Sequence, residues 1–153
     1  GIKMGLKNIN IHVINSKNDL KVDGANLRIR PVYEGIDGLV LLSQLDDHQI
    51  ANILNNINRE PRIKKETIKP EALISKIQQI RQQGYAYSNS ELSLGVTCIS
   101  APVKNYSLPA VLNLVGPEFR MKPRMADFTR ELLKSTTHIS DNLSTWHDPH
   151  IVH

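Results

Sequence analysis

Four features are scarce or missing in this sequence, and each absence excludes a class of protein. A single cysteine, Cys98, cannot form an internal disulfide, which fits a reducing cytoplasm. The longest apolar run, GLVLLSQL, is far too short to cross a bilayer. No basic segment followed by an apolar run and a cleavage site opens the chain, so nothing marks it for secretion. Aromatic residues make up only 5% and do not alternate with basic ones, as binding of single-stranded nucleic acid requires. We therefore expect a cytoplasmic protein without a membrane partner.

Charge and length are ordinary for a globular domain. The net charge is only +4, and the densest basic group, RIKKETIK, is interpreted as a solvated segment and not as a phosphate-binding patch. The 153 residues suit one compact domain with a single core, and the sequence has no internal repeat. We expect a single domain over residues 1–153, with an ordered core over about 8–143 and a loose tail over 144–153.

The first part of the chain shows strand patterns. Residues 8–15 alternate, with Ile9, Ile11 and Val13 on one face, and this alternation predicts a strand. The turn SKND and the extended segment LKV then complete a predicted hairpin. The next extended segment, NLRIRPVY, is limited by Pro31 to a strand end or a sheet edge.

Three helices are predicted next. In EGIDGLVLLSQL the leucines crowd together as in a short buried helix, and Asp46 with Gln49 has the spacing of a capping box before the second helix. Pro70 suits the first turn of the third helix, and Gly84 lies where a left-handed C-terminal cap belongs. The third helix has an apolar stripe that comprises Leu73, Ile74, Ile77 and Ile80.

The last part of the chain predicts a loop, a hairpin and a helix. YAYSNSELS is expected to be the loop, and the hairpin consists of LGVTCISAPV and PAVLNLVGP joined by KNYS. The helix is expected to start near Pro123, with an apolar stripe of Met125, Phe128, Leu132, Ile139 and Leu143. Strands at both ends of the chain with helices between them predict an α+β fold, a mainly antiparallel sheet flanked by helices.

Cys98 is the first candidate for chemistry. It lies within a predicted strand, where Val96 and Ser100 share its face. A thiol nucleophile needs a neighbouring base or a helix N-terminus, and no histidine is near Cys98 in sequence. Free cysteine is also among the most buried residue types. A core residue, a pocket wall and a nucleophile all remain open.

Two further features suggest contact with a ligand. Asn113 is an amide in the apolar strand VLNLV and, if buried, needs a partner from the backbone, water or a ligand. EGIDG precedes a helix whose free N–H groups could hold an anion, although its glycines also suit a simple turn. Asp37 places a negative charge beside that anion position, which is unfavourable unless its side chain turns away or caps the helix.

Histidines gather at the C-terminus but predict no metal site. They are His138, His147, His150 and His153. A solvated tail is the preferred interpretation, because metal ligands need rigid support. The sequence also has no phosphate loop, paired-carboxylate motif or hydrolase elbow. We expect no metal, no cofactor and no enzymatic activity.

One long segment carries the most specific pattern in the chain. It is IRQQGYAYSNSELSLGVTCISAPV, and it resembles the effector-binding domain of IclR-type bacterial transcription regulators. RPVYEGIDGLVLLSQLDDHQI, LNLVGPEFRM and ELLKSTTHISDNL agree with this resemblance, which runs from the first strand to Leu143. It implies a GAF/PAS-like fold, a mainly antiparallel sheet flanked by helices with a ligand cavity on one face.

The resemblance also implies a function. Domains of this family sense a small molecule, commonly an organic acid or an aromatic catabolite, and change DNA binding elsewhere. It implies homodimers or tetramers, and contact with DNA only through a separate N-terminal winged helix-turn-helix domain, which we expect to be absent from this chain. The alternatives are an oligomerisation module without a ligand and a thiol enzyme that uses Cys98.

The family's ligand-contact positions can be located in this sequence. They are Cys98, Asn113, Val115, Ser88, Asn89, Ile36 and Asp37. Ser88 is not acidic here, Val115 cannot form a hydrogen bond, and Asp37 replaces a small or apolar residue. These departures count against a plain short carboxylate as the ligand.

Overall fold

A six-stranded sheet organises the molecule. The computed structural model describes residues 1–18, 21–22, 29–59, 70–91 and 93–146. Neighbouring strands are antiparallel throughout, in the order β3-β2-β1-β6-β5-β4. The strands are β1 (Ile2–Met4), β2 (Lys7–Ile9), β3 (Ile29–Pro31), β4 (Ala86–Asn89), β5 (Val96–Val103) and β6 (Ala110–Pro117). This arrangement confirms the predicted α+β fold with a mainly antiparallel sheet.

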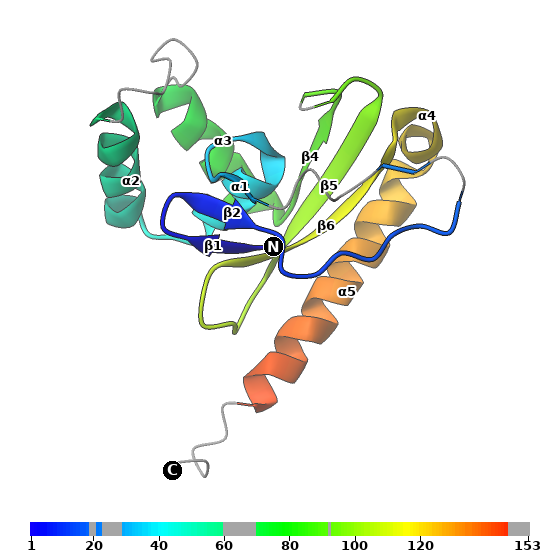
Figure 1. Cartoon of the computed structure of the whole chain (residues 1–153). Helices are drawn as coiled ribbons and strands as arrows, with labels where there is room; N and C mark the ends of the chain where they lie inside the picture. The colour runs from blue at the N-terminus through cyan, green and yellow to red at the C-terminus, as the bar shows by residue number, and fades with distance from the viewer. Residues whose placement is uncertain (19–20, 23–28, 60–69, 92, 147–153) are drawn as a thin grey trace.

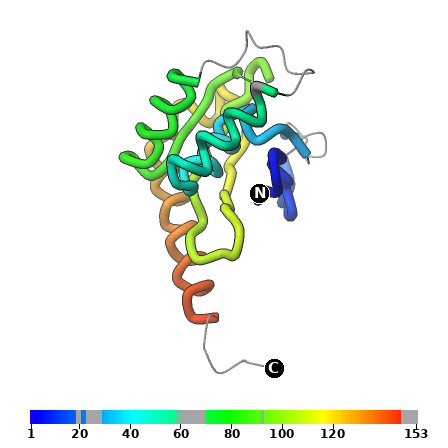
Figure 2. The backbone as a smooth tube through the Cα atoms, turned by 90° about the vertical axis from the view of Figure 1, so that its left-hand side faces the viewer, coloured from blue at the N-terminus to red at the C-terminus, as the bar shows by residue number. Residues whose placement is uncertain are grey.

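Helices cover both faces of the sheet. Figure 1 shows α1, α2 and α3 on one side of the sheet and α4 and α5 on the other, and Figure 2 views the molecule from the α2–α3 side. The helices are α1 (Gly35–Ser43), α2 (Asp47–Arg59), α3 (Pro70–Gln83), α4 (Glu118–Met121), the short 3₁₀ helix η3 (Lys122–Arg124) and α5 (Met125–Thr145). Each face therefore has its own apolar core, one shared with α1 and one shared with α5.

The first helix is buried on every side, as its leucine-rich sequence predicts. Residues 36–42 are all buried, so α1 lies between the sheet and the other helices of its face. Gly38 makes this position possible, because a Cβ atom there would lie 2.0 Å from the carbonyl oxygen of Val32. Val32 directly follows β3 and is itself fully buried. Gly38 thus fixes the start of α1 against the end of β3.

Local helix signals were predicted correctly. The backbone N–H of Gln49 donates to Asp46 Oδ1 at 2.7 Å, and the N–H of Asp46 donates to Gln49 Oε1 at 3.1 Å. This reciprocal pair is the predicted capping box. Pro70 is the first residue of α3, and Gly84 follows the helix with a φ of +81°. Short-range spacing therefore sets where α2 begins and where α3 begins and ends.

The N-terminal strands differ from the prediction. Of the predicted strand over 8–15, only residues 8 and 9 belong to a strand, β2 (Lys7–Ile9). The three residues of β2 pair with the three residues of β3, and the pairing ends at Ile9. Ile11 and Val13 are exposed outside any strand. The predicted strand LKV is also absent where it is described, at residues 21–22. β1 was not predicted, whereas Pro31 does end an edge strand as expected.

The segment YAYSNSELS is not a loop throughout. Its residues Ala86–Asn89 form β4 and pair with β5 along the sheet edge. Its inward residues, Ala86 and Ser88, are too small or polar to give an apolar alternation, which explains the wrong prediction. The next strands, β5 and β6, form the predicted hairpin.

The apolar stripes and the tail need smaller corrections. Ile74 is 39% exposed and Ile139 is 36% exposed, so neither is in the core stripe of its helix. Pro123 belongs to η3, and α5 begins at Met125 and continues through Thr145, beyond the predicted start of the tail. Residues 147–153 lie outside the described residues. No helix in the described part of the chain is both long and apolar enough to span a membrane.

Candidate functional site

The cysteine and the asparagine singled out in the sequence lie on the same face of the sheet. In the β5–β6 hairpin Cys98 lies opposite Val115, and Ser100 lies opposite Asn113. Directly paired residues project to one side of an antiparallel sheet, and alternate residues share that side. Cys98 packs against the core that α1 occupies, so this face of the hairpin looks toward α1. The thiol and the amide therefore both face the helix side on which Asp37 lies.

Cys98 is half-buried, and its thiol is neutral. Its Sγ atom lies 3.4 Å from Ser100 Oγ. Burial is the main reason that the pKa of the Cys98 thiol rises to about 12. The hydrogen bond with Ser100 lowers this pKa, and the negative charge of Asp37 raises it, but both effects are smaller than that of burial. A thiol with this pKa carries almost no thiolate at neutral pH and is a poor nucleophile. Its surroundings suit a pocket wall or a core position.

Asp37 is the centre of a buried polar cluster. It lies in the first turn of α1 and is only 2% exposed. Its Oδ2 atom accepts hydrogen bonds from Asn8 Nδ2 at 2.7 Å and from Arg30 Nη2, and a long one of 3.5 Å from Asn113 Nδ2. Asn8 and Arg30 are directly paired on β2 and β3, so both side chains project toward α1. The helix start, the two short strands and the hairpin converge on one carboxylate.

Several polar atoms of this cluster lack a partner among the described residues. They are Asn8 Oδ1, Asn113 Oδ1, and Nε and Nη1 of Arg30, all of them buried. Buried polar atoms in folded proteins are almost always hydrogen-bonded to protein, water or a ligand. Two acceptors and two donors around Asp37 are thus available for hydrogen bonds to a bound molecule or to water.

The other predicted site residues fall into two groups. Ser88 is buried and lies opposite Cys98, so Ser88, Cys98 and Val115 form one row across three strands. Ile36 packs in the core of the same face. Asn89 is not brought to this cluster, because it alternates with Ser88 and its Oδ1 accepts a hydrogen bond from Thr97 on the opposite face.

Sequence reasoning missed Asn8 and Arg30. The alternation centred on Ile9 assigned the apolar residues to the buried face, which left Asn8 on the solvent side. In the structure both faces are covered: Asn8 is 2% exposed beside α1, whereas Ile9 packs on the α5 side. The available signal was Asp37 itself, since a buried carboxylate at a helix start requires donors from elsewhere in the chain.

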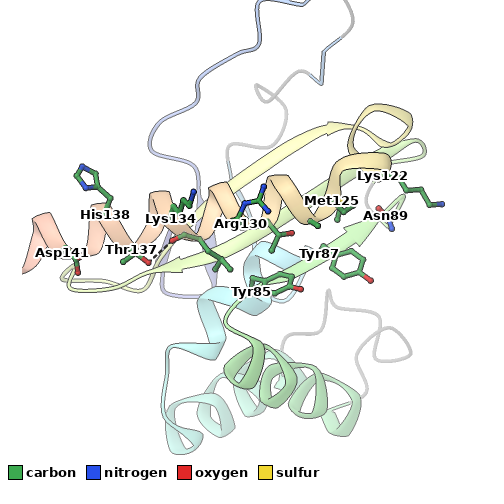
Figure 3. A pocket seen from close by; sticks show the side chains of 13 residues that line it. Tyr85, Tyr87, Asn89, Lys122, Met125, Arg130, Lys134, Thr137, His138 and Asp141 are labelled. Atoms are coloured by element: carbon green, nitrogen blue, oxygen red, sulfur yellow. Dashed lines mark hydrogen bonds between the residues drawn. The ribbon is translucent and has the colours of Figure 1, made fainter.

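A separate groove lies on the opposite face of the sheet. It has a volume of about 1060 Å³ and is lined by Tyr85, Tyr87 and the exposed side of α5, as Figure 3 shows. Two of its cations, Arg130 and Lys134, are exposed and form ion pairs within α5 itself. None of the predicted site residues except Asn89 lines this groove. The groove is open to solvent, and these two cations already have partners within α5. It therefore gives less reason to expect a ligand than the buried cluster around Asp37.

The described residues hold no group of three or more side chains suited to a metal ion. His138 lies on α5, where it contacts Asn142. The remaining three histidines of the predicted C-terminal cluster lie in residues 147–153, outside the described part of the chain.

Comparison with known proteins agrees with this architecture. Residues 1–141 match the family described as bacterial transcriptional regulator IclR C-terminal. The HTH-type transcriptional regulator KdgR of Escherichia coli is 32% identical over 93 residues, which cover 61% of this chain and 35% of KdgR. The Pca regulon regulatory protein of Pseudomonas putida is 32% identical over 89 residues, 58% of this chain and 29% of that protein. The match thus spans about a third of these curated relatives.

Solved structures show the same fold. The C-terminal domain of E. coli KdgR superposes with a TM-score of 0.70 at 26% identity, covering 94% of this chain and 84% of that one. The IclR protein of Thermotoga maritima gives a TM-score of 0.76 at 19% identity, covering 93% and 59% of the two chains. These relatives are transcription regulators and not enzymes. The chain belongs to the IclR family of bacterial transcription regulators, whose C-terminal domain it carries over residues 1–141.

Proposed function

We propose that this domain binds a small-molecule effector on the α1 face of its sheet. The observation that carries the proposal is the set of buried, unpartnered donors and acceptors around Asp37, beside Cys98 and Asn113. Specific ligand sites combine apolar walls with a few polar groups that fix orientation, and this face offers both. An organic acid or an aromatic catabolite is the ligand class that the family resemblance predicts.

Binding would act on DNA through a separate domain. A ligand shifts an equilibrium only by its different affinities for two arrangements of the regulator, so the effector has to favour one of them. We infer that the full regulator reads DNA with an N-terminal winged helix-turn-helix domain and assembles as a homodimer or tetramer. The thiol-enzyme alternative is disfavoured by the raised pKa of Cys98.

A ligand screen with matched variants tests the proposal. Catabolic acids, aromatics and sugars are screened by thermal shift, and each hit is titrated against the wild type, Cys98→Ala and Asn113→Ala. We expect Asn113→Ala to weaken binding about tenfold, which corresponds to one lost hydrogen bond. Tyr87→Ala is the control, because Tyr87 is 52% exposed on the other face. Hits that bind Asn113→Ala unchanged but lose affinity for Tyr87→Ala would move the site to the groove beside α5.

A further inference from the structure

We propose that the Asp37 carboxylate occupies the anion position of this site, so that the domain binds an uncharged hydroxyl- or amide-bearing effector and excludes free carboxylates. This inference rests on the proposed function and specifies its ligand class. It narrows the two classes predicted from the family resemblance, because it disfavours organic acids.

Asp37 lies in the first turn of α1, next to the Arg30 guanidinium. The start of an α-helix attracts anions because its N–H groups are free and its dipole is positive there. Asp37 lies in that first turn, nearly inaccessible to solvent, and its carboxylate accepts hydrogen bonds from Arg30 and Asn8. A side chain of the protein itself therefore fills the place beside the Arg30 guanidinium where a ligand carboxylate would otherwise bind.

The charge of Asp37 is already balanced by that of Arg30. Arg30 and Asp37 form an ion pair whose side chains are 13% and 3% exposed, so one buried positive charge already compensates one buried negative charge. A carboxylate ligand would add a second negative charge next to Asp37. The N-terminal ammonium of Gly1 also interacts with Asp37, but it donates to the Val111 carbonyl oxygen at 2.8 Å, and burial lowers its pKa, which disfavours its charged form. Burying an unpaired charge is far more costly than burying a hydrogen-bonded neutral group. The pair thus selects against acids and not against alcohols or amides.

The unpartnered buried atoms at this site include both hydrogen-bond acceptors and hydrogen-bond donors. Asn8 Oδ1 and Asn113 Oδ1 can only accept hydrogen bonds, whereas Nε and Nη1 of Arg30 can only donate them. A hydroxyl or a carboxamide both donates and accepts, so it can satisfy the two kinds of atom together. A carboxylate only accepts and would leave the two amide oxygens without donors. The neutral thiol of Cys98 adds no charge to this environment.

The experiment uses matched acids and amides as probes. Acetate and benzoate are compared with acetamide and benzamide on the 153-residue chain and on Asp37→Asn, by NMR titration at constant ionic strength. We expect the wild type to bind each amide at least tenfold more tightly than the matched carboxylate, and Asp37→Asn to bind the carboxylates at least tenfold more tightly than the wild type does. Carboxylates that bind the wild type as tightly as they bind Asp37→Asn would overturn the inference, as would an Asp37→Asn variant that binds neither.

Chemical rescue gives an independent readout. Asp37→Ala removes the carboxylate and leaves Arg30 unpaired, so acetate should raise the melting temperature of this variant more than equal chloride does. Arg30→Gln/Asp37→Ala is the matched control and should gain nothing beyond the chloride effect. Equal responses of the two variants would contradict the inference. Circular dichroism measures how much Asp37→Ala folds when acetate is added. The rescue experiment therefore tests the anion position even if Asp37→Asn does not fold.

The two proposals can fail separately. If acetate rescues Asp37→Ala but no compound in the screen binds the α1 face, the sensor function is wrong and the anion position stands. If an effector binds through Asn113 and is itself a carboxylate, the sensor function stands and the ligand class is wrong.

Discussion

Breaking the ion pair between Arg30 and Asp37 should destabilise the domain strongly. Arg30→Met keeps most of the side chain's length and removes its charge. Because the Asp37 side chain is only 3% exposed, the remaining carboxylate cannot recover its hydration and keeps only Asn8 as a close donor. Removing one partner of a buried pair costs about 3–5 kcal/mol, against about 0–1 kcal/mol for an exposed pair. We expect Arg30→Met to fall in the first range.

A double-mutant cycle separates the pair from its surroundings. Asp37→Asn alone leaves a buried guanidinium, and Arg30→Met/Asp37→Asn removes both charges. The double variant should lose less stability than the sum of the single losses, with a coupling of about 1–3 kcal/mol. Urea unfolding followed by circular dichroism measures each free energy. For a chain of this length the melting temperature falls about 2–4 °C per kcal/mol, so Arg30→Met should lower it by about 6–20 °C.

An exposed ion pair provides the control for this cycle. Lys134 is 66% exposed and pairs with Glu131 on α5, so Lys134→Met should change stability by no more than about 0.5 kcal/mol. If Arg30→Met behaves like Lys134→Met, or if the single losses simply add, then Asp37 is solvated and its charge does not exclude a ligand carboxylate.

Four further predictions follow from other contacts. Iodoacetamide should label Cys98 in the folded protein at pH 8 at least about a hundredfold more slowly than a free thiol, because the pKa rises from 9.0 to about 12. Rapid labelling in mass spectra would contradict this. For the same reason, wild type should lose stability relative to Cys98→Ala as the pH rises above about 9, since the folded state holds its proton longer than the unfolded state. Gly38→Ala should cost about 3 kcal/mol in urea unfolding because its Cβ would meet Val32, and a near-neutral result would mean that α1 can shift. Asp46→Ala should cost about 1 kcal/mol by loss of the cap, whereas Asp46→Asn should cost little.

Features set by neighbouring residues were predictable from the sequence. The capping box at Asp46 and the left-handed Gly84 depend on spacings of a few residues, and both are present. The hairpin of β5 and β6 was recognisable because each strand has eight residues and the turn between them is short. The sequence left open whether Cys98 and Asn113 share a face, and the observed register places them on the same one.

Features set by distant pairing were not predictable. β1, β2 and β3 have three residues each, too few for a clear alternation, and they exist because they pair with one another and with β6. The burial of Asn8 and Arg30 depends on that pairing and on the carboxylate of Asp37, which lies in another element. The polar centre of the candidate site therefore arises from tertiary contacts that no single segment encodes.

The close fit of Gly38 against Val32 has a mechanical consequence. With no room for even one additional carbon between them, the beginning of α1 cannot slide along the chain that precedes it. Arg30 lies two residues before Val32 and holds Asp37 from the other side, so helix and edge strand are tied together twice. If an effector binds as proposed, a displacement of α1 has to carry β3 with it, because Gly38 and Asp37 both tie the helix to that edge strand or to the residue after it.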